Sequence, residues 1–177
     1  RLGLCDNNKQ LRTLIEAQLE KRISDPKKHG GVFMPTEYKG HLQTMVEAWK
    51  ERFPTLKIRI VNADNPLTEQ ELRDLADPNK RTEWDLLICS PSLRDGFHIM
   101  GSFELVAGDY SQSANDILTD QEIINALLRV RTCKEFALHC KDTKSLEGTL
   151  KSYQILEKRG LDFIDLPKHF RLTDPRT

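Results

Sequence analysis

The sequence lacks the features that mark membrane proteins and nucleic-acid-binding tails. No apolar run approaches the roughly 18 residues of a membrane-spanning helix, and no signal peptide pattern is present. No basic run is long enough to form a tail. Hydrophobic residues make up 38% and charged residues 31% of the 177 positions. This composition is typical of one globular domain with a buried core and no membrane partner.

Cysteine is scarce and shows no CxxC spacing, so we expect buried thiols in a cytoplasmic protein. The four positions are Cys5, Cys89, Cys133 and Cys140. A zinc site at Cys133, His139 and Cys140 is the less favoured interpretation, because a closed site needs four converging ligands. The chain begins at Arg1 and not at Met, and we expect it to be part of a longer protein.

Several catalytic motifs are also missing. The sequence contains no GxxxxGK[ST] phosphate loop, no GxGxxG after a strand, no HExxH and no GxSxG. No apolar strand ends in the Asp-Glu pair that would hold magnesium. The chain therefore has no phosphate-binding loop of its own.

The net charge of zero hides an uneven distribution. Residues 1–60 carry 12 basic and 7 acidic side chains, residues 61–125 carry 4 and 13, and residues 126–177 carry 11 and 7. A local positive face could bind phosphate, although solvated helices give the same pattern equally often.

Strand and helix patterns alternate along the chain. Short apolar or alternating runs predict strands at residues 31–35, 56–61, 85–90, 103–107 and 135–140. Amphipathic spacing predicts helices at residues 7–22, 36–53, 68–76, 119–128 and 145–159. Asp6 is the expected N-cap of the first helix, and Thr68 with Glu71 forms a capping box. This order predicts an α/β domain with a mostly parallel sheet flanked by helices, with function at the carboxyl ends of the strands.

Residues 90–97 follow the clearest predicted strand. Ser90 and Ser92 offer hydroxyl groups suited to phosphate oxygens, and Gly96 allows close approach of the backbone. An ordinary turn is the competing interpretation.

Residues 125–131 end a predicted helix with Arg129 and Arg131. Arginine is always charged and pairs with two phosphate oxygens at once, so such residues can neutralise charge in phosphoryl transfer. The competing interpretation is that these cations stabilise the C-terminus of a helix.

These two segments, in this order, resemble motifs V and VI of the second motor domain of superfamily 2 helicases. They are most similar to the herpesvirus-type origin-binding helicases and their plasmid and cyanobacterial replication-protein relatives. Residues 31–36 resemble motif IV, and residues 103–109 resemble the strand before motif VI. The resemblance covers residues 28–141. It implies a RecA-like helicase C-terminal domain, of the P-loop NTPase type but without its own P-loop.

The resemblance also implies roles for individual residues. Thr36, Ser90 and Ser92 would contact the nucleic-acid backbone. Asp95 and Gly96 would lie near ATP. The catalytic arginines, Arg129 and Arg131, would reach the triphosphate held by the other motor domain.

The partners implied are an N-terminal motor domain of the same full-length protein and DNA, either single-stranded or at a replication origin. ATP and Mg would be held mainly by that other domain, so no cofactor would bind this chain tightly and the isolated chain would be inactive. Residues 1–27 are interpreted as an N-terminal helix or linker. Residues 142–177 are interpreted as a helix and tail packed on the same domain.

Some residues depart from the family pattern. Asn125 stands where Gln is usual, Leu128 stands where Gly is usual, and Arg94 and His98 occupy places of small residues. A catalytically inactive helicase-like module is therefore the alternative function. A third possibility is an unrelated α/β enzyme or small-molecule binder, with His41 and His98 as its acid–base candidates.

Overall fold

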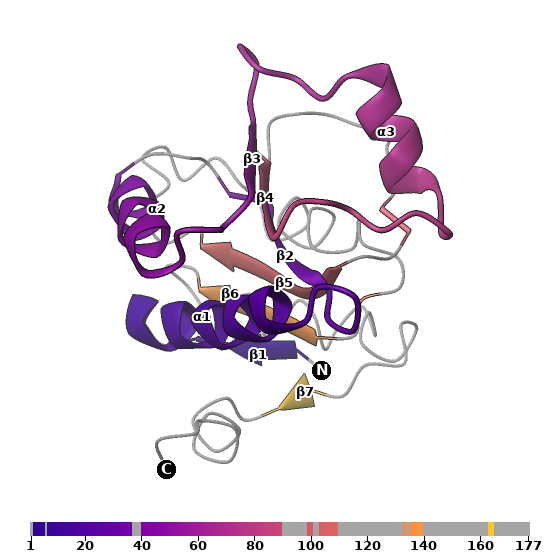
Figure 1. Ribbon diagram of the computed structural model, residues 1–177. Helices are drawn as coiled ribbons and strands as arrows, with labels where there is room; N and C mark the ends of the chain where they lie inside the picture. Colours follow the sequence, from indigo (N-terminus) through magenta and orange to yellow (C-terminus); the bar gives the residue numbers. More distant parts are fainter. Residues whose placement is uncertain are drawn as a thin grey trace.

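The computed structural model contains one sheet of seven strands in which every pairing is parallel (Figure 1). It describes residues 2–5, 7–36, 40–89, 99–100, 103–109, 133, 135–139 and 163–164, with only the backbone at 2–4 and 163–164. The strand order is β3-β4-β2-β5-β6-β1-β7. The strands are β1 Leu2–Leu4, β2 Gly31–Met34, β3 Ile58–Val61, β4 Leu86–Cys89, β5 Phe103–Asp109, β6 Glu135–His139 and β7 Phe163–Ile164. The α/β class with a parallel sheet is confirmed.

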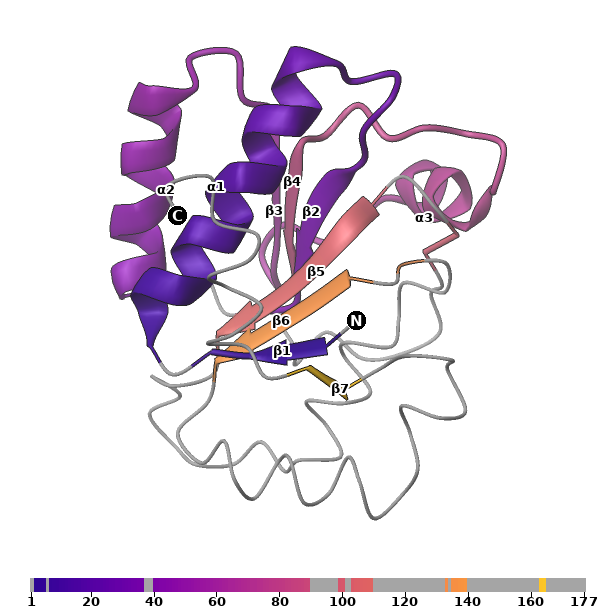
Figure 2. The same cartoon turned by 90° about the horizontal axis from the view of Figure 1, so that it is seen from below.

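Within the described residues, three helices flank this sheet. α1 (Asn8–Ser24) and α2 (His41–Arg52) lie together on one face, whereas α3 (Glu69–Ala76) lies on the other side (Figure 2). The apolar side chains of α1 and α2 pack on one face of the central strands and form a single cluster. Its fully or nearly fully buried members include Leu11, Ile15, Val32, Met34, Val46, Trp49, Leu86 and Ile88. No helix in the described part of the chain is long and apolar enough to cross a membrane.

Hydrogen bonds and ion pairs also tie α1 to α2. Glu16 of α1 accepts a hydrogen bond from Nε1 of Trp49 at 2.9 Å and one from Nη1 of Arg52 at 2.8 Å. Arg52 also pairs with Glu20. The two helices are therefore held together by polar as well as apolar contacts, and both begin at the carboxyl edge of the sheet.

The helix ends follow local capping chemistry. The capping box at Thr68 and Glu71 is confirmed, because each residue's side chain accepts from the other's backbone N–H. For α1 the prediction of Asp6 as N-cap was wrong: Asn7 is the N-cap, and its side chain accepts from the N–H of Gln10 at 3.0 Å. Asn and Asp are equally good N-caps, so two such residues in succession leave the choice to tertiary packing.

A β-bulge in β5 changes which side chains face the helices. Gly31 pairs with Phe103 but Val32 pairs with Leu105, so Glu104 is the extra residue. The Glu104 carboxylate accepts hydrogen bonds from the N–H of Gly30 at 2.7 Å and from Nε2 of Gln18 at 3.1 Å. The bulge is therefore held by α1 and by the residue before β2.

The amino edge of the sheet has little free space. A Cβ atom on Gly31 would lie only 2.6 Å from the carbonyl oxygen of Asp85 and 3.0 Å from that of Trp84. The N–H of Val32 donates to the same Asp85 oxygen at 2.8 Å. Glycine at position 31 thus lets the start of β2 approach the segment before β4.

Two of the observed strands were not predicted. β1 pairs with β6 and β7, so the first residues of the chain belong to the same sheet as the rest. The helices predicted at 119–128 and 145–159 lie outside the described residues. The division at residues 27 and 142 stays a prediction.

Candidate nucleic-acid interface

The segments that resemble helicase motifs follow neighbouring strands. β2 pairs in parallel with β4, with Met34 opposite Ile88, and with β5 on its other side. Parallel strands end at the same edge of a sheet, which is where α/β proteins place their ligands. The strands before the segments that resemble motifs IV and V are therefore adjacent, and β5 is next to β2.

Thr36 lies two residues beyond β2 at this edge and is 4% exposed. Its Oγ1 accepts a hydrogen bond from the backbone N–H of Asp109, the last residue of β5, at 3.0 Å. This bond uses a lone pair of the hydroxyl oxygen, so the hydroxyl hydrogen can still be donated. The contact of Thr36 with the nucleic-acid backbone stays a prediction.

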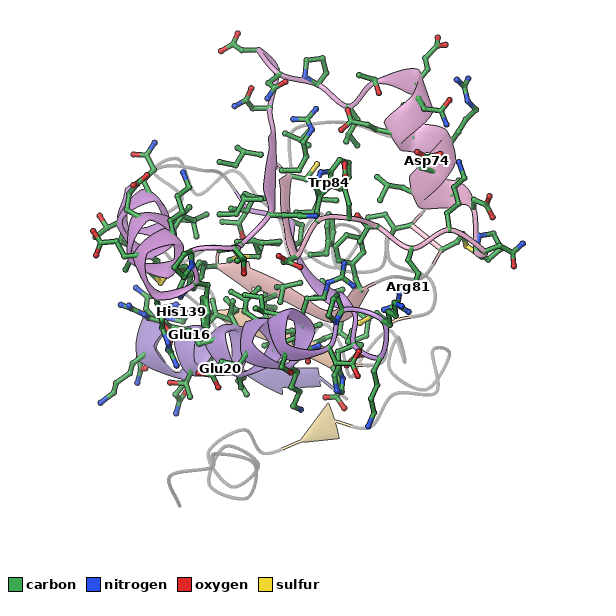
Figure 3. All side chains as sticks on the ribbon, viewed as in Figure 1. Glu16, Glu20, Asp74, Arg81, Trp84 and His139 are labelled. Carbon is green, nitrogen blue, oxygen red and sulfur yellow. The ribbon has the colours of Figure 1, made fainter. Side chains whose placement is uncertain are left out.

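Asp109 is the centre of a group of polar residues that we call the strand-end cluster. Its Oδ2 lies 2.9 Å from Nε2 of His41, and its Oδ1 lies 3.2 Å from Nδ1 of His139. The Asp109 side chain is 4% exposed, whereas the side chains of His139 and His41 are 13% and 28% exposed. One buried carboxylate is thus shared by two histidines (His139 is labelled in Figure 3).

Asn8, the first residue of α1, completes the strand-end cluster. Its Nδ2 lies 3.2 Å from Nε2 of His41, the nitrogen that also meets Asp109. One ring nitrogen cannot donate to Asp109 and accept from Asn8 in the same state. The Oδ1 of Asn8 and the Nδ1 of His139 are buried and have no hydrogen bond of good geometry. The cluster therefore has hydrogen-bonding capacity that its present contacts do not use.

The strand-end cluster comprises Asn8, Thr36, His41, Asp109 and His139. Its members come from four elements and the end of β2, and all lie at the carboxyl edge. With neutral imidazoles the cluster carries the one negative charge of Asp109; with both rings protonated its net charge is positive. Hydroxyl and imidazole groups at this edge can bind phosphate oxygens, and the two rings can exchange protons.

The zinc interpretation has no support in the described part of the chain. Cys133 lies at the amino end of β6, where its Sγ donates to the carbonyl oxygens of Glu104 and Glu135 at 3.2 and 3.3 Å. His139 ends the same strand at the opposite edge. Within the described ranges no group of three or more His, Cys, Asp or Glu side chains could hold a metal ion. Cys140 lies outside them.

Burial dominates the chemistry of Cys133. The side chain is enclosed by the sheet, and the residue is 3% exposed. Loss of solvation disfavours the thiolate and raises the pKa of Cys133 to about 11. Cys5 and Cys89 are buried as well. Burial of these three side chains agrees with the expectation from the sequence.

A cavity of about 420 Å³ lies between α3 and residues 80–84, away from the strand-end cluster. Its lining includes Asp74, Lys80, Arg81 and Trp84, three of which are labelled in Figure 3. Lys80 pairs with Asp74 at 2.8 Å. The small-molecule interpretation needs an acid–base residue beside its pocket. His41, the described candidate for that role, does not line this cavity.

The remaining predicted site residues belong to segments that the structure does not describe. Ser90, Ser92, Asp95 and Gly96 follow β4 in the sequence but lie outside the described residues, as do Arg129 and Arg131. His98, Asn125 and Leu128 lie outside them too. Their roles, and the binding of ATP and Mg, stay predictions.

Sequence reasoning singled out Thr36 and His41 but not their connection. Asp109 and His139 are register partners on β5 and β6. Each is the last residue of a mostly apolar strand, and a polar residue at that position is the signal that could have found them. The prediction placed the end of the first of these strands at residue 107, two residues too early.

Comparisons with known proteins find similar solved structures but no match in sequence. No family model and no curated protein sequence matches the chain. Among solved structures, it is similar to the C-terminal domain of a possible DNA helicase from Lactobacillus plantarum, with a TM-score of 0.42 and 13% identity over 79% of this chain and 72% of that one. It is also similar to the C-terminal domain of S. cerevisiae Dbp5 bound to Gle1 and IP6, with a TM-score of 0.49 and 16% identity over 86% and 83%. Because both TM-scores lie below 0.5, the fold described above rests on the strand order and register of this chain alone.

Proposed function

We propose that this chain is the second motor domain of a superfamily 2 helicase or helicase-like replication protein. It supplies nucleic-acid backbone contacts and the arginines that complete an ATP site. The triphosphate and Mg are held mainly by an N-terminal motor domain of the same protein. The motif resemblance supports, as its kind, the herpesvirus-type origin-binding and plasmid replication helicases.

The observation that carries the proposal is the pairing of β2 with β4. The residues that resemble motifs IV and V are 54 positions apart in the sequence (Thr36 and Ser90), yet their strands are in parallel register. The residues that resemble motif IV and those that resemble motif V thus follow neighbouring strands that end at the same edge of the sheet. An accidental pair of short sequence matches would have no reason to coincide in this way.

The absence of a phosphate loop also fits this role. A motor built from two such domains needs only one GxxxxGK[ST] loop, and it belongs to the partner domain. ATP then bridges the domains, and its tighter binding to the closed state moves them relative to one another along the strand.

The central experiment replaces the predicted catalytic arginines in the protein that contains both motor domains. We expect Arg129→Ala and Arg131→Ala each to lower DNA-stimulated ATP hydrolysis by about 10³–10⁵-fold, because transition-state charge is no longer neutralised. ATP binding, measured separately with a fluorescent analogue, should be retained. Turnover at the wild-type rate in both variants would refute the proposal.

A matched control keeps the residue type and changes the location. Arg73 on α3 has a side chain that is 65% exposed and pairs with Glu69 only at 3.9 Å. Arg73→Ala should therefore hydrolyse ATP like the wild type. The isolated 177-residue chain should show no ATP hydrolysis, and activity from it alone would contradict the division of labour between two domains.

A catalytically inactive helicase-like module is the second candidate. The replacement of the usual Gln and Gly by Asn125 and Leu128 favours it. If the two-domain protein binds DNA but does not hydrolyse ATP, and Asn125→Gln with Leu128→Gly restores hydrolysis, the module is a degenerate motor. Hydrolysis by the wild-type protein excludes this alternative.

A further inference from the structure

The predicted contact Thr36 and the histidine His41 are connected through one residue. Asp109 donates its backbone N–H to Thr36 at 3.0 Å, and its carboxylate lies 2.9 Å from the ring of His41. The position of Thr36 at the strand end is thus coupled to that of His41 at the start of α2.

Of these residues, His41 is the most exposed. Its side chain is 28% exposed, whereas Thr36 is 4% exposed and the Asp109 side chain 4%. The bond through Nε2 leaves Nδ1 of His41 as the second ring nitrogen, with no hydrogen bond given to it by the described residues. An imidazole fixed at one nitrogen by a carboxylate is oriented to offer its other nitrogen to a ligand.

The charge of the strand-end cluster depends on its histidines. Among the described residues, Asp109 supplies the ion-pair partner of both His41 and His139, and the neighbouring Asn8 and Thr36 are neutral. With neutral rings the edge repels phosphate through Asp109. Protonation of one ring cancels that charge, and protonation of both leaves the edge positive. Among side chains, histidine is the one whose charge most readily changes with pH in the physiological range.

We propose that His41, oriented by Asp109, is a pH-dependent phosphate contact of the nucleic-acid interface, and that its protonated form strengthens the binding of single-stranded nucleic acid. This inference rests on the proposed function, since it assigns a residue to the interface of a helicase motor domain. The ligand is the phosphodiester backbone, so the contact is independent of base sequence. Because binding takes up a proton, affinity falls as the pH rises through the range in which histidine loses its charge.

The test measures fluorescence anisotropy of a labelled oligo(dT) of roughly 20 nucleotides with the 177-residue chain. For the wild type we expect affinity about fivefold higher at about pH 5.5 than at about pH 8. His41→Gln should remove most of this difference. At the lower pH it should also reduce the slope of log affinity against log salt by about 0.7, the value for one phosphate contact on a single strand.

Two further variants separate a phosphate contact from a structural role. His41→Lys carries a positive charge at both pH values and should bind as tightly at about pH 8 as the wild type does at about pH 5.5. His29→Gln is the matched control, because His29 is 27% exposed and lies 3.5 Å from Glu104 at the opposite edge. It should keep the wild-type pH dependence. Circular dichroism checks that each variant is folded.

The outcomes distinguish this inference from the proposed function. If the wild type binds oligo(dT) and His41→Gln has the same pH profile and salt slope, the inference is overturned and the nucleic-acid interface remains. If the wild type shows no binding at either pH in low salt, the proposed nucleic-acid interface fails and the inference fails with it. Equal loss of pH dependence in His29→Gln and His41→Gln also overturns the inference.

Discussion

Arg22 and Asp85 form a buried ion pair that joins the end of α1 to the start of β4. The Nε of Arg22 lies 3.0 Å from Oδ1 of Asp85, and the two side chains are 3% and 10% exposed. The same guanidinium donates to three carbonyl oxygens, at Pro26, His29 and Thr82. The other carboxylate oxygen accepts from the N–H of Lys57 at 2.9 Å. Both charges are therefore compensated by several partners, as buried charges require.

Removal of one partner of this pair should destabilise the domain strongly. Arg22→Met leaves the Asp85 carboxylate buried without its cation and removes one donor from the carbonyl oxygens of Pro26, His29 and Thr82, of which those of Pro26 and His29 still accept from Arg81. We expect a loss of about 3–5 kcal/mol in the free energy of unfolding, measured by urea denaturation. Lys21→Met, on the exposed side of the same helical turn, should change it by less than about 0.5 kcal/mol. Equal values for the two variants would show that the pair contributes little.

The hydroxyl of Thr36 has a structural role that can be measured separately from its predicted role in nucleic-acid binding. Thr36→Val deprives the buried N–H of Asp109 of its acceptor and should cost about 1–3 kcal/mol in the free energy of unfolding. Thr36→Ser retains the oxygen and should lose less. If Thr36 also contacts the nucleic-acid backbone, oligonucleotide affinity should follow the hydroxyl, being kept in the serine variant and lowered in the valine variant. Equal affinity in both would remove Thr36 from the interface.

Glu71 makes the stability of the domain depend on pH at acid values. Hydrogen bonds from the Arg59 guanidinium, at 2.9 and 3.1 Å, hold the pKa of Glu71 below its ordinary value of 4.5. A carboxyl group with a lowered pKa in the folded state stabilises the fold above its unfolded pKa, and this contribution is lost as the pH falls through the folded value.

We therefore expect Glu71→Gln to be less stable than the wild type by about 1 kcal/mol at neutral pH, since the pair is partly exposed. The difference should shrink as the pH drops below 4.5. Glu69→Gln is the control, because Glu69 is in the same helical turn with a side chain that is 92% exposed. Urea denaturation at several pH values measures both. A difference that grows toward acid pH would contradict the assignment.

Cys133 should be unreactive in the folded protein. With a pKa raised to about 11 by burial, only roughly one thiol in a thousand is ionised at about pH 8, and the side chain is also inaccessible. We expect iodoacetamide to leave Cys133 unmodified in buffer and to alkylate it fully in urea, as measured by peptide mass spectrometry. Rapid alkylation of the native protein would mean that the amino end of β6 opens.

The sequence patterns that predicted structure correctly are those in which neighbouring residues decide the outcome. The Thr68–Glu71 capping box needs only residues three positions apart. The apolar run at residues 86–89 is a strand buried on both faces, as such runs are in parallel sheets. β1 and β7 were missed because three and two residues are too few to show a period, and their partners are distant in sequence.

In the candidate interface, too, the sequence identified single residues but not the contacts between residues that are distant in sequence. Thr36 was singled out by the resemblance to motif IV, and His41 because it is a histidine near a predicted strand end and helix start. The sharing of Asp109 between His41 and His139 depends on the register of β5 with β6 and on how α2 packs, neither of which is local. The bulge at Glu104 likewise depends on Gln18 of α1 and on Gly30, the residue before β2, which both contact its carboxylate.

The position of β1 between β6 and β7 affects how the chain acquires its fold. Leu2 pairs with Phe136 and Phe163, more than 130 positions further along the polypeptide. Both neighbours are therefore synthesised long after β1, so its peptide groups stay hydrated until they emerge. Pairings of such large sequence separation slow folding. The strands β2 to β5 pair with one another across about 75 residues or fewer. During translation these strands are expected to assemble before β1 joins them.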